Sequence, residues 1–559
     1  MILPDDQVKT LLLQSGLVTE KALEDLLVFA ANSRISLQEA AIEKDAVSDE
    51  QLGRLIADLL KLPFAVLSKV TIPETVFRIV PERIARKYKV ISFAKENDGI
   101  KLAMANPSQS MIQEMVGKKT WQKVMPYFAT ERDIENALQM YRKDLKQTFD
   151  ELLQQEITST TLADDAPIVK IVDLLITYAY RDKASDIHIE PEEDNLLIRF
   201  RIDGILHDVL YLDKKFHDRI VARVKVLSRL RTDEHLSAQD GKIRIIVDDE
   251  NLDLRVSIIP IIEGEKIVLR LLSSRFRQFS FLDLGMNQKD LQKANSAINK
   301  TYGMILSTGP TGSGKTTSIY AILKILNTRE KNITTIEDPV EYRIKGVNQI
   351  QVNQKTNLTF ANGLRSILRQ DPNVIFVGEI RDNETAGIAV NAALTGHLVV
   401  STLHTNDAAT ALPRFIDMKV EPFLVASTVN VIIAQRLVRK ICEYCKVPSS
   451  INRANILKNI PPEILQKHFG EQENIQAHEG KGCKACHFTG YQGRVGIFEV
   501  LEMSEKIKKL IVEKNDSDVI TKEAVALGMT TMVNDGLEKV TKGITTIEEV
   551  LRVTKVEML

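Results

Sequence analysis

The stretch Gly309-Pro310-Thr311-Gly312-Ser313-Gly314-Lys315-Thr316 decides how the rest of the chain is interpreted. It satisfies the pattern G-x-x-x-x-G-K-[ST] of a phosphate-binding loop. An apolar strand pattern, Met304–Thr308, runs into the glycines, and a helical pattern, Thr317–Leu326, follows them. We therefore expect the loop at a helix N-terminus, where free backbone N–H groups and the helix dipole attract phosphate.

The residue types in this loop predict binding of ATP with Mg²⁺. Glycine lets the backbone approach phosphate closely, Lys315 is expected to reach the β- and γ-phosphates, and the Thr316 hydroxyl to hold Mg²⁺. The flanking strand and helix disfavour the alternative of a glycine-rich turn that binds nothing. The predicted nucleotide-binding residues of the loop are Gly309, Pro310, Thr311, Gly312, Ser313, Gly314, Lys315, Thr316 and Thr317.

Two acidic segments downstream are candidates for the hydrolysis chemistry. Hydrolysis needs carboxylates that hold Mg²⁺ and orient water, best placed where parallel strands end. Glu337 and Glu379 each end an apolar strand pattern, 332–336 and 373–378. We expect Glu337 to activate water and Glu379 to support Mg²⁺ or that water. Which of them is the general base stays open, and a loop carboxylate or helix cap is the alternative for each.

Two histidines bracket a third strand pattern, Leu398–Thr402. The imidazole of His397 or His404 could donate a hydrogen bond to a γ-phosphate and so report its presence. An isolated histidine beside a strand is more often a structural residue.

Length and composition limit the class of protein. At roughly 150 residues per domain, 559 residues predict three or four domains. Hydrophobic residues are 44% and charged residues 27%, which excludes disordered and fibrous classes. A net charge of -1, one Trp and 5% aromatics argue against a nucleic-acid groove. The acidic start and the lack of an apolar run near 18 residues predict a cytosolic protein.

Shifts in pattern predict the domain organisation. Two helical stretches with N-caps at Thr19 and Ser48, followed by a small α/β unit, indicate a separate N-terminal domain. From residue 285 strands and helices alternate, which predicts a mostly parallel sheet with helices on both faces. The predicted parts are an N-terminal helical and α/β domain 1–145, a linker 146–166, an α+β domain 167–284, and an ATPase domain 285–559 with a helical C-terminus.

The four cysteines form two Cys-x-x-Cys pairs, Cys442/Cys445 and Cys483/Cys486, in an insertion at about 440–490. Paired cysteines at this spacing indicate a structural Zn²⁺ site with four thiolates. Cys483–His487 also fits a c-type haem attachment, but that chemistry requires export. Free thiols or a redox pair are the remaining alternative.

In combination and in order, these motifs resemble the secretion ATPases, and more narrowly the assembly ATPases of type IV pili and type II secretion systems. The matching segments are the phosphate loop, Ile336–Glu341, Gly378–Asp382, Thr395–Asp407, Ala184–Pro191 and Ile198–Gly204. The resemblance is good from Pro167 onward and weak before about residue 150. It implies an α/β, multidomain chain: a RecA-like P-loop NTPase core, a preceding α+β (PAS-like) domain and a mostly helical N-terminal domain.

The resemblance also implies roles for four arginines. Arg255 and Arg270 match positions from which the second domain reaches over the γ-phosphate. Arg365 and Arg369 are four residues apart and are expected on one helix face near the acidic strand ends. Without the family, surface strand arginines are the simpler interpretation of Arg255 and Arg270, and a solvated helix face is the alternative for Arg365 and Arg369.

The resemblance further implies a homo-hexamer with ATP, Mg²⁺ and Zn²⁺ as cofactors, which couples hydrolysis to assembly of a pilus or secretion pseudopilus. Its expected partners are an inner-membrane platform protein and a cytoplasmic docking protein, without direct nucleic acid, at the inner face of the cytoplasmic membrane. Residues 7–16 depart from the Arg-Leu-Gly signature of cyclic di-GMP modules, so docking is expected there in place of dinucleotide binding.

Two other functions remain as alternatives. A nucleic-acid translocase or helicase on a RecA-like core would need a basic, aromatic-bearing groove. A nucleotide-gated scaffold would lack the loop lysine or an acid, and both are present. Pilus, secretion and competence systems share every motif used here, so the sequence does not distinguish them.

Overall fold

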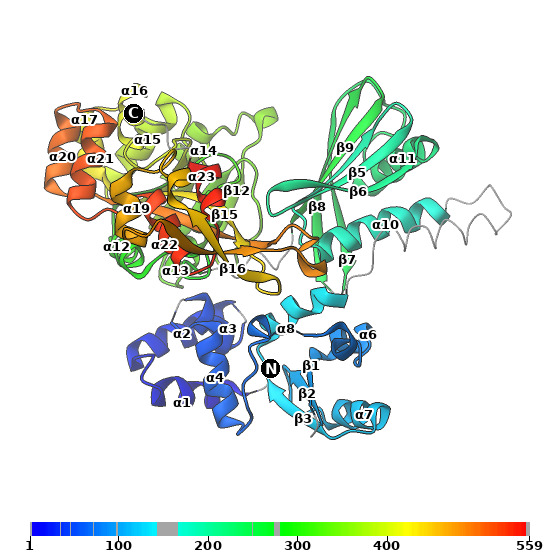
Figure 1. The fold of residues 1–559 in the computed structure, drawn as a ribbon. Coiled ribbons are helices and arrows are strands. Elements are labelled where there is room, and N and C mark those ends of the chain that lie inside the picture. The colour runs from blue at the N-terminus through cyan, green and yellow to red at the C-terminus, as the bar shows by residue number, and fades with distance from the viewer. Residues whose placement is uncertain are drawn as a thin grey trace. The chain divides into compact units, whose positions relative to one another are not determined.

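The computed structural model describes residues 3–141, 166–272 and 280–554, apart from residues 34, 45, 71, 97, 98 and 249 (Figure 1). The chain forms two compact units, of which one comprises Met1–Ile134 with Phe279–Leu559 and the other Glu135–Gln278. The predicted linker 146–166 lies outside the described residues except for Ala166, which begins a helix.

The N-terminal segment is a bundle of four short helices. They are α1 (Asp5–Gln14), α2 (Glu20–Ser33), α3 (Leu37–Glu43) and α4 (Asp49–Leu59). The predicted N-caps are confirmed: Thr19 accepts a hydrogen bond from the Ala22 N–H, and Ser48 forms a capping box with Gln51. Val8, Leu12 and Ile56 pack in the shared core, so each short helix is held by its neighbours.

A small α/β module follows, as its alternating patterns predict. The sheet order is β1-β2-β3, with β1 antiparallel to β2 and β2 parallel to β3. Helix α7 makes the crossover that a parallel pair requires. The elements are η1 (Leu67–Lys69), α5 (Glu74–Phe77), α6 (Glu82–Tyr88), β1 (Val90–Glu96), β2 (Gly99–Met104), α7 (Ser110–Thr120), β3 (Val124–Phe128), α8 (Glu131–Ala137) and η2 (Leu138–Tyr141).

The unit Glu135–Gln278 is built on a six-stranded antiparallel sheet of order β6-β5-β4-β9-β8-β7. Its strands alternate buried and exposed residues, and α10 and α11 pack on the apolar face. The elements are α10 (Ala166–Arg181), β4 (Asp186–Pro191), β5 (Asn195–Ile202), β6 (Ile205–Asp213), η3 (Lys214–Phe216), α11 (His217–Ser228), β7 (Gln239–Val247), β8 (Glu250–Ile261) and β9 (Gly264–Leu272).

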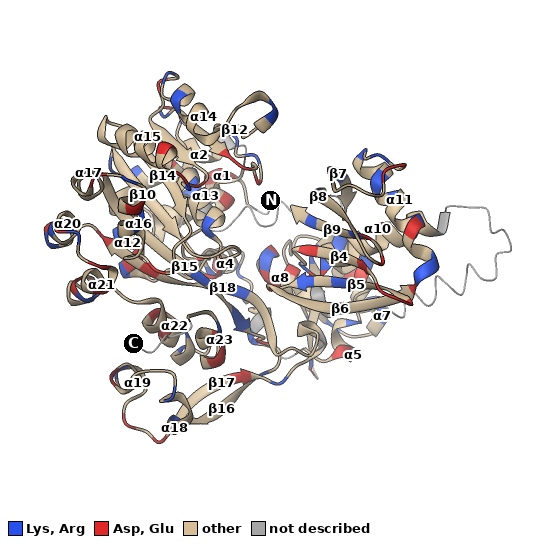
Figure 2. Cartoon of the chain, turned by 90° about the horizontal axis from the view of Figure 1, so that it is seen from above, with Lys and Arg blue, Asp and Glu red and all other residues tan. Residues whose placement is uncertain are grey.

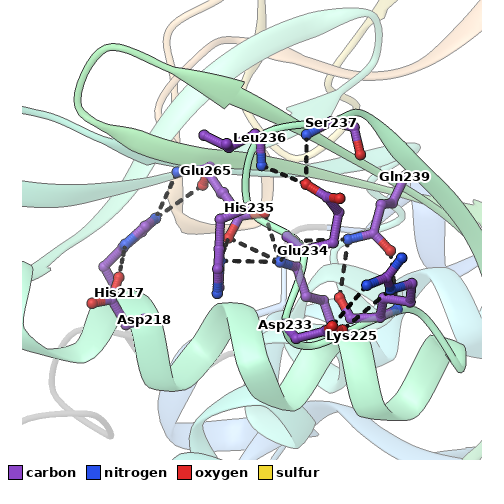
Figure 3. Close-up of polar contacts among 11 residues, drawn as sticks. His217, Asp218, Lys225, Asp233, Glu234, His235, Leu236, Ser237, Gln239 and Glu265 are labelled. Carbon is purple, nitrogen blue, oxygen red and sulfur yellow. Dashed lines mark hydrogen bonds and ion pairs between the residues drawn. The ribbon is translucent and has the colours of Figure 1, made fainter.

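A buried ion pair ties α11 to β9 in this unit (Figure 3). The Lys225 ammonium is fully buried, 2.7 Å from the Glu265 carboxylate, and donates to the Glu234 carbonyl at 2.6 Å. His235 Nδ1 lies 2.7 Å from the other Glu265 oxygen. The loop between α11 and β7 is thereby fastened to the sheet.

The ATPase segment carries a seven-stranded sheet of order β12-β11-β13-β14-β10-β15-β18, parallel except for β18. Helices α12 and α13 cover one face, and α14 to α17 cover the other. The α/β prediction is confirmed. The elements are α12 (Gln288–Ile298), β10 (Gly303–Thr308), α13 (Lys315–Leu326), β11 (Ile333–Glu337), β12 (Asn348–Gln351), η5 (Gln354–Thr356), α14 (Phe360–Ile367), β13 (Val374–Val377), α15 (Asn383–Leu394), β14 (Leu398–Leu403), α16 (Ala411–Asp417), α17 (Pro422–Thr428), β15 (Val429–Ile441) and β18 (Tyr491–Glu502).

The long hairpin arms β15 and β18 enclose an insertion, and four helices end the chain. The insertion comprises β16 (Lys446–Asn452), α18 (Arg453–Ile456), α19 (Pro462–Phe469), β17 (Asn474–Gly480) and η6 (Lys484–Cys486). The final helices are α20 (Glu505–Val512), α21 (Ser517–Ala526), α22 (Met532–Thr541) and α23 (Ile547–Thr554).

Two surface properties are common to both units. Lys and Arg are interspersed with Asp and Glu along their elements, as the net charge of -1 leads one to expect (Figure 2). Among the residues that the structure describes, every helix is too short or too polar to cross a bilayer.

Candidate functional site

The phosphate loop lies where β10 ends and α13 begins. All six residues of β10 are buried, so the strand holds the loop from inside the sheet. Gly314 is the N-cap of α13, with φ 92° and no side chain to bond the first N–H groups. Glycine adopts this left-handed conformation without steric cost, and the helix N-terminus stays open to an anion.

Lys315, the first residue of α13, is 8% exposed and curls back over the loop. Its Nζ donates to the carbonyls of Gly309 at 2.7 Å and Pro310 at 3.0 Å. Burial lowers the pKa of this ammonium to about 8, while the charge of Glu379 acts to raise it. The lysine is thus held at the loop by acceptors that the phosphates of a nucleotide can replace.

Glu379 and His404 meet at the carboxyl edge of the parallel sheet. Glu379 follows β13 and His404 follows β14, and these strands are neighbours. Oε2 of Glu379 lies 3.2 Å from His404 Nε2 and 2.7 Å from Arg381 Nε. The Glu379 side chain is 16% exposed. The structure therefore brings Lys315, Glu379 and His404 to one edge, with Arg381 as a partner that sequence reasoning did not select.

Glu337 ends β11 in a more enclosed setting. Its carboxylate accepts hydrogen bonds from the Tyr320 hydroxyl, from Thr335 Oγ1 at 2.6 Å and from Gln349 Nε2 at 3.2 Å. The residue is 3% exposed, and burial raises its pKa against the opposing effect of these donors. Sequence reasoning missed Tyr320, although it lies one helical turn beyond Thr316 on the same face of α13.

His397 lies at the opposite end of the sheet. It immediately precedes β14, and its carbonyl accepts from the N–H of Gly303, the first residue of β10. Its Nδ1 lies 3.0 Å from the Ala392 carbonyl. The phosphate loop follows the other end of β10, so the length of this strand, about 20 Å, separates His397 from the loop. The structure does not bring His397 to the phosphate loop.

The prediction that Arg365 and Arg369 share one helix face is wrong. Helix α14 ends at Ile367, so Arg369 lies in the turn beyond it. Arg365 pairs with Glu384 and donates to Asn362 Oδ1 at 3.2 Å. Arg369 donates to the Arg365 carbonyl at 3.1 Å and to Ser366 Oγ at 3.3 Å. Both guanidinium groups are engaged locally.

Arg255 on β8 and Arg270 on β9 are direct cross-strand neighbours in the other unit. Arg270 Nε lies 2.9 Å from Asp186 Oδ1, and Arg201 Nε lies 3.4 Å from Oδ2 of the same carboxylate. Lys242 is opposite Arg255 on β7. One row across the sheet thus carries four basic side chains and a single acid, on the face away from the core.

The sulfur atoms of the four cysteines lie close enough together to bind one metal ion. Their Sγ atoms all lie within 4.8 Å of one another, with separations of 3.8 Å for Cys442–Cys483, 3.8 Å for Cys445–Cys486 and 3.7 Å for Cys483–Cys486. A Zn–S bond of about 2.3 Å in a tetrahedron places sulfurs about 3.8 Å apart. The set therefore fits Zn²⁺ as predicted.

One of these thiols is prepared to ionise. A hydrogen bond from Cys442, together with those from the backbone N–H groups of Cys483 and Gly490, lowers the pKa of the Cys486 thiol. A thiolate is the form that binds a metal ion.

Comparison with known proteins finds relatives over the whole chain. A family model described as "Type II/IV secretion system protein" matches residues 161–552, and the model of the "MshEN domain" matches residues 60–148. The chain is 36% identical to the "Type IV pilus assembly ATPase PilB" of Myxococcus xanthus (strain DK1622), over 97% of each chain. It is 41% identical to the "Type II secretion system protein E" of Pectobacterium carotovorum subsp. carotovorum, over 86% of this chain and 97% of that one.

Solved structures confirm the predicted RecA-like core. The ATPase DotB of Yersinia pseudotuberculosis matches with a TM-score of 0.51 and 20% identity, over 71% of this chain and 95% of that one. DotB of Legionella pneumophila matches with a TM-score of 0.50 and 22% identity, over 69% and 95%. The segment 161–552 contains the phosphate loop, both acids and all four cysteines. The prediction that residues 1–145 dock a partner without binding cyclic di-GMP stays a prediction.

Proposed function

The chain belongs to the type II/IV secretion system protein family, and we propose that it is the motor ATPase of a type IV pilus or type II secretion machine. As an ATPase of this family it uses ATP and Mg²⁺. One observation carries the proposal: a glycine loop at the carboxyl edge of a parallel sheet with Lys315, Glu379 and His404 beside it.

Each group at this edge has a task in phosphoryl transfer. The N–H groups at the start of α13 and the Lys315 ammonium bind phosphate, and the Thr316 hydroxyl holds Mg²⁺. Glu379 supports Mg²⁺ or the attacking water, and His404, bonded to Glu379, senses the γ-phosphate. We assign the general base to Glu337, because it ends β11 next to β13, the strand that leads to Glu379, and because burial raises its pKa.

Arg255 and Arg270 extend this chemistry to the second unit. Guanidinium groups that pair with developing phosphate charge couple the movement of their own domain to hydrolysis. In a homo-hexamer, open and closed subunits bind ATP and ADP with different affinities. Exchange of ATP for ADP during hydrolysis therefore drives the movement between the two states. We assign residues 167–284 to this moving domain and residues 285–559 to catalysis.

The same proposal covers the surroundings of the motor. Residues 1–145 dock a cytoplasmic partner, and the movement is passed to a platform protein at the inner face of the cytoplasmic membrane. Zn²⁺ held by Cys442, Cys445, Cys483 and Cys486 has no open position, so it supports the β15–β18 hairpin and takes no part in hydrolysis. The nucleic-acid translocase receives no support, because the named relatives are pilus and secretion ATPases.

Two substitutions test the proposal. Lys315→Ala removes hydrolysis because the loop loses its only side-chain cation. Glu379→Gln keeps ATP binding but lowers turnover by about two orders of magnitude or more, because the carboxylate acts on the transition state. Phosphate release by the purified full-length chain, with and without Mg²⁺, measures both effects.

Lys345→Ala, at an exposed lysine of the same segment, is the matched control and leaves the rate unchanged. Rates equal to the wild type in both Lys315→Ala and Glu379→Gln would refute the assignment of this edge as the catalytic site.

A further inference from the structure

A buried glutamine next to the phosphate loop has no part in the chemistry described above. Gln435 lies on β15, which runs beside β10, and is 2% exposed. Its Nε2 donates to the Ser313 carbonyl at 2.7 Å, and its Oε1 accepts from Ser318 Oγ at 2.6 Å. One side-chain amide therefore bridges the last turn of the loop and the first turns of α13.

The bond to Ser313 determines the direction of a phosphate-binding group. The Ser313 carbonyl and the Gly314 N–H belong to one planar trans peptide and point in opposite directions. Since the carbonyl is held toward β15, the Gly314 N–H is directed away from that strand. Free N–H groups at this helix N-terminus are the ones that bind an anion.

The loop also packs tightly against this strand. A Cβ at Gly309 would lie 2.6 Å from the Gln435 carbonyl, and a Cβ at Gly314 would lie 2.8 Å from Gln435 Nε2. Both distances are below van der Waals contact, so the two glycines allow β15 to lie directly against both ends of the loop. Any shift of the Gln435 amide is thus transmitted to the loop backbone.

The arrangement permits one orientation of the amide. With Oε1 accepting from Ser318, only Nε2 faces the Ser313 carbonyl. An acceptor in its place would set two oxygens against each other and leave a buried carbonyl without a donor, which is costly.

We propose that Gln435 is a positioning residue that holds the phosphate loop in its nucleotide-binding conformation and so sets the affinity for ATP. The inference deepens the proposed function, since it rests on the loop of the ATPase. It concerns binding, and it leaves the acids that carry hydrolysis untouched.

Gln435→Glu is the decisive variant, because it keeps the size of the side chain and exchanges the donor for an acceptor. In the full-length chain we expect the Kd for a fluorescent ATP analogue with Mg²⁺, and the KM for ATP, to rise at least about tenfold. The kcat at saturating ATP stays within about threefold, because bound phosphates hold the loop. Ser318→Ala raises the same Kd about threefold, since it frees the amide to rotate.

Asn430 on the same strand provides a matched control. Its Nδ2 donates to the Tyr302 carbonyl at 2.8 Å, at the end of the sheet away from the loop. Asn430→Asp makes the same exchange of amide for carboxylate, and its Kd stays within twofold of the wild type. A role of Gln435 in folding alone would lower the melting temperature and leave Kd unchanged.

A folded Gln435→Glu variant with a Kd within twofold of the wild type overturns the proposal. If that variant loses its folded state, Gln435→Met decides by the same criterion, because it removes the donor without adding an acceptor. A wild-type chain that binds the ATP analogue without hydrolysing ATP would refute the motor function and leave this test intact.

Discussion

The affinity for nucleotide is expected to depend on pH through the buried ammonium group of Lys315. Its pKa is about 8 in the ligand-free loop, so the ammonium is progressively lost as the pH rises through 8. Bound phosphates favour the charged form, and binding then takes up a proton. We expect the Kd for an ATP analogue to rise about tenfold or more between pH 7.5 and pH 9.5, measured by fluorescence titration of the full-length chain.

The Lys345→Ala variant shows the same pH dependence, because that lysine is exposed and distant in sequence from the loop. An affinity that stays constant over this range would contradict the lowered pKa of Lys315.

Tyr320 tests the role of Glu337. Its hydroxyl donates to the Glu337 carboxylate, and this bond favours the ionised form. Tyr320→Phe removes the donor, so the pKa of Glu337 rises further and the base is protonated up to a higher pH. We expect the acidic limb of the kcat profile to move to higher pH, so that the loss of kcat is larger on the acidic side of the profile than on the alkaline side.

Tyr342→Phe is a suitable control, because it is the same substitution in a neighbouring ring. The Tyr342 ring packs edge-on against the Tyr320 ring, with 4.4 Å between the ring centroids. A uniform loss of kcat at every pH in Tyr320→Phe would argue that Glu337 is not the base.

At the scale of elements, the attachment of α11 to β9 rests on Lys225 and Glu265. Removing one partner of a buried ion pair leaves the other charge uncompensated, at a cost of about 3–5 kcal/mol. Lys225→Met is therefore expected to accelerate hydrogen exchange of the α11 and β9 amides strongly in the full-length chain.

The exposed pair Lys214–Glu263 at the neighbouring hairpin gives the contrast. Its N–O distance is 2.8 Å, but such a pair contributes about 1 kcal/mol or less. Lys214→Met should leave exchange in these elements nearly unchanged, and equal effects of the two substitutions would exclude a special role for the buried pair.

At the scale of the whole molecule, the proposed function assigns Arg255 and Arg270 of the second unit a part in ATP hydrolysis. We expect Arg255→Ala and Arg270→Ala to lower kcat by about two to three orders of magnitude while ATP binding is retained, because guanidinium groups stabilise charge that develops in the transition state. Turnover and analogue binding of the purified chain are the measurements.

Arg244 provides the control on the same sheet face, since it pairs with Asp253 at 2.6 Å and is 74% exposed. Arg244→Ala should keep wild-type kcat. Wild-type turnover in both Arg255→Ala and Arg270→Ala would show that ATP hydrolysis does not depend on these arginines.

Much of the catalytic edge could be predicted because its signals are local. A strand, a glycine loop and a helix follow one another within about 20 residues. A residue that comes just after a parallel strand is expected at the carboxyl edge of the sheet. For the same reason the sequence singles out Glu379 and His404: Glu379 lies two residues after buried strand β13, and His404 directly follows buried strand β14. His397 also flanks β14, but it precedes the strand, whereas His404 follows it. The direction of β14 in the sheet therefore places the two histidines at opposite ends of the sheet.

The phosphate loop, the alternation of strands and helices in the ATPase segment and the two Cys-x-x-Cys pairs can be predicted from the sequence, because each depends on neighbours along the chain. Three other contacts are visible only in the folded chain: Gln435 holds Ser313 from 122 residues away, Tyr320 bonds Glu337, and Arg270 lies between Asp186 and Arg255. These contacts depend on which strands become neighbours in a sheet. That choice is made by burial and backbone pairing over the whole domain, which no short stretch of residues contains.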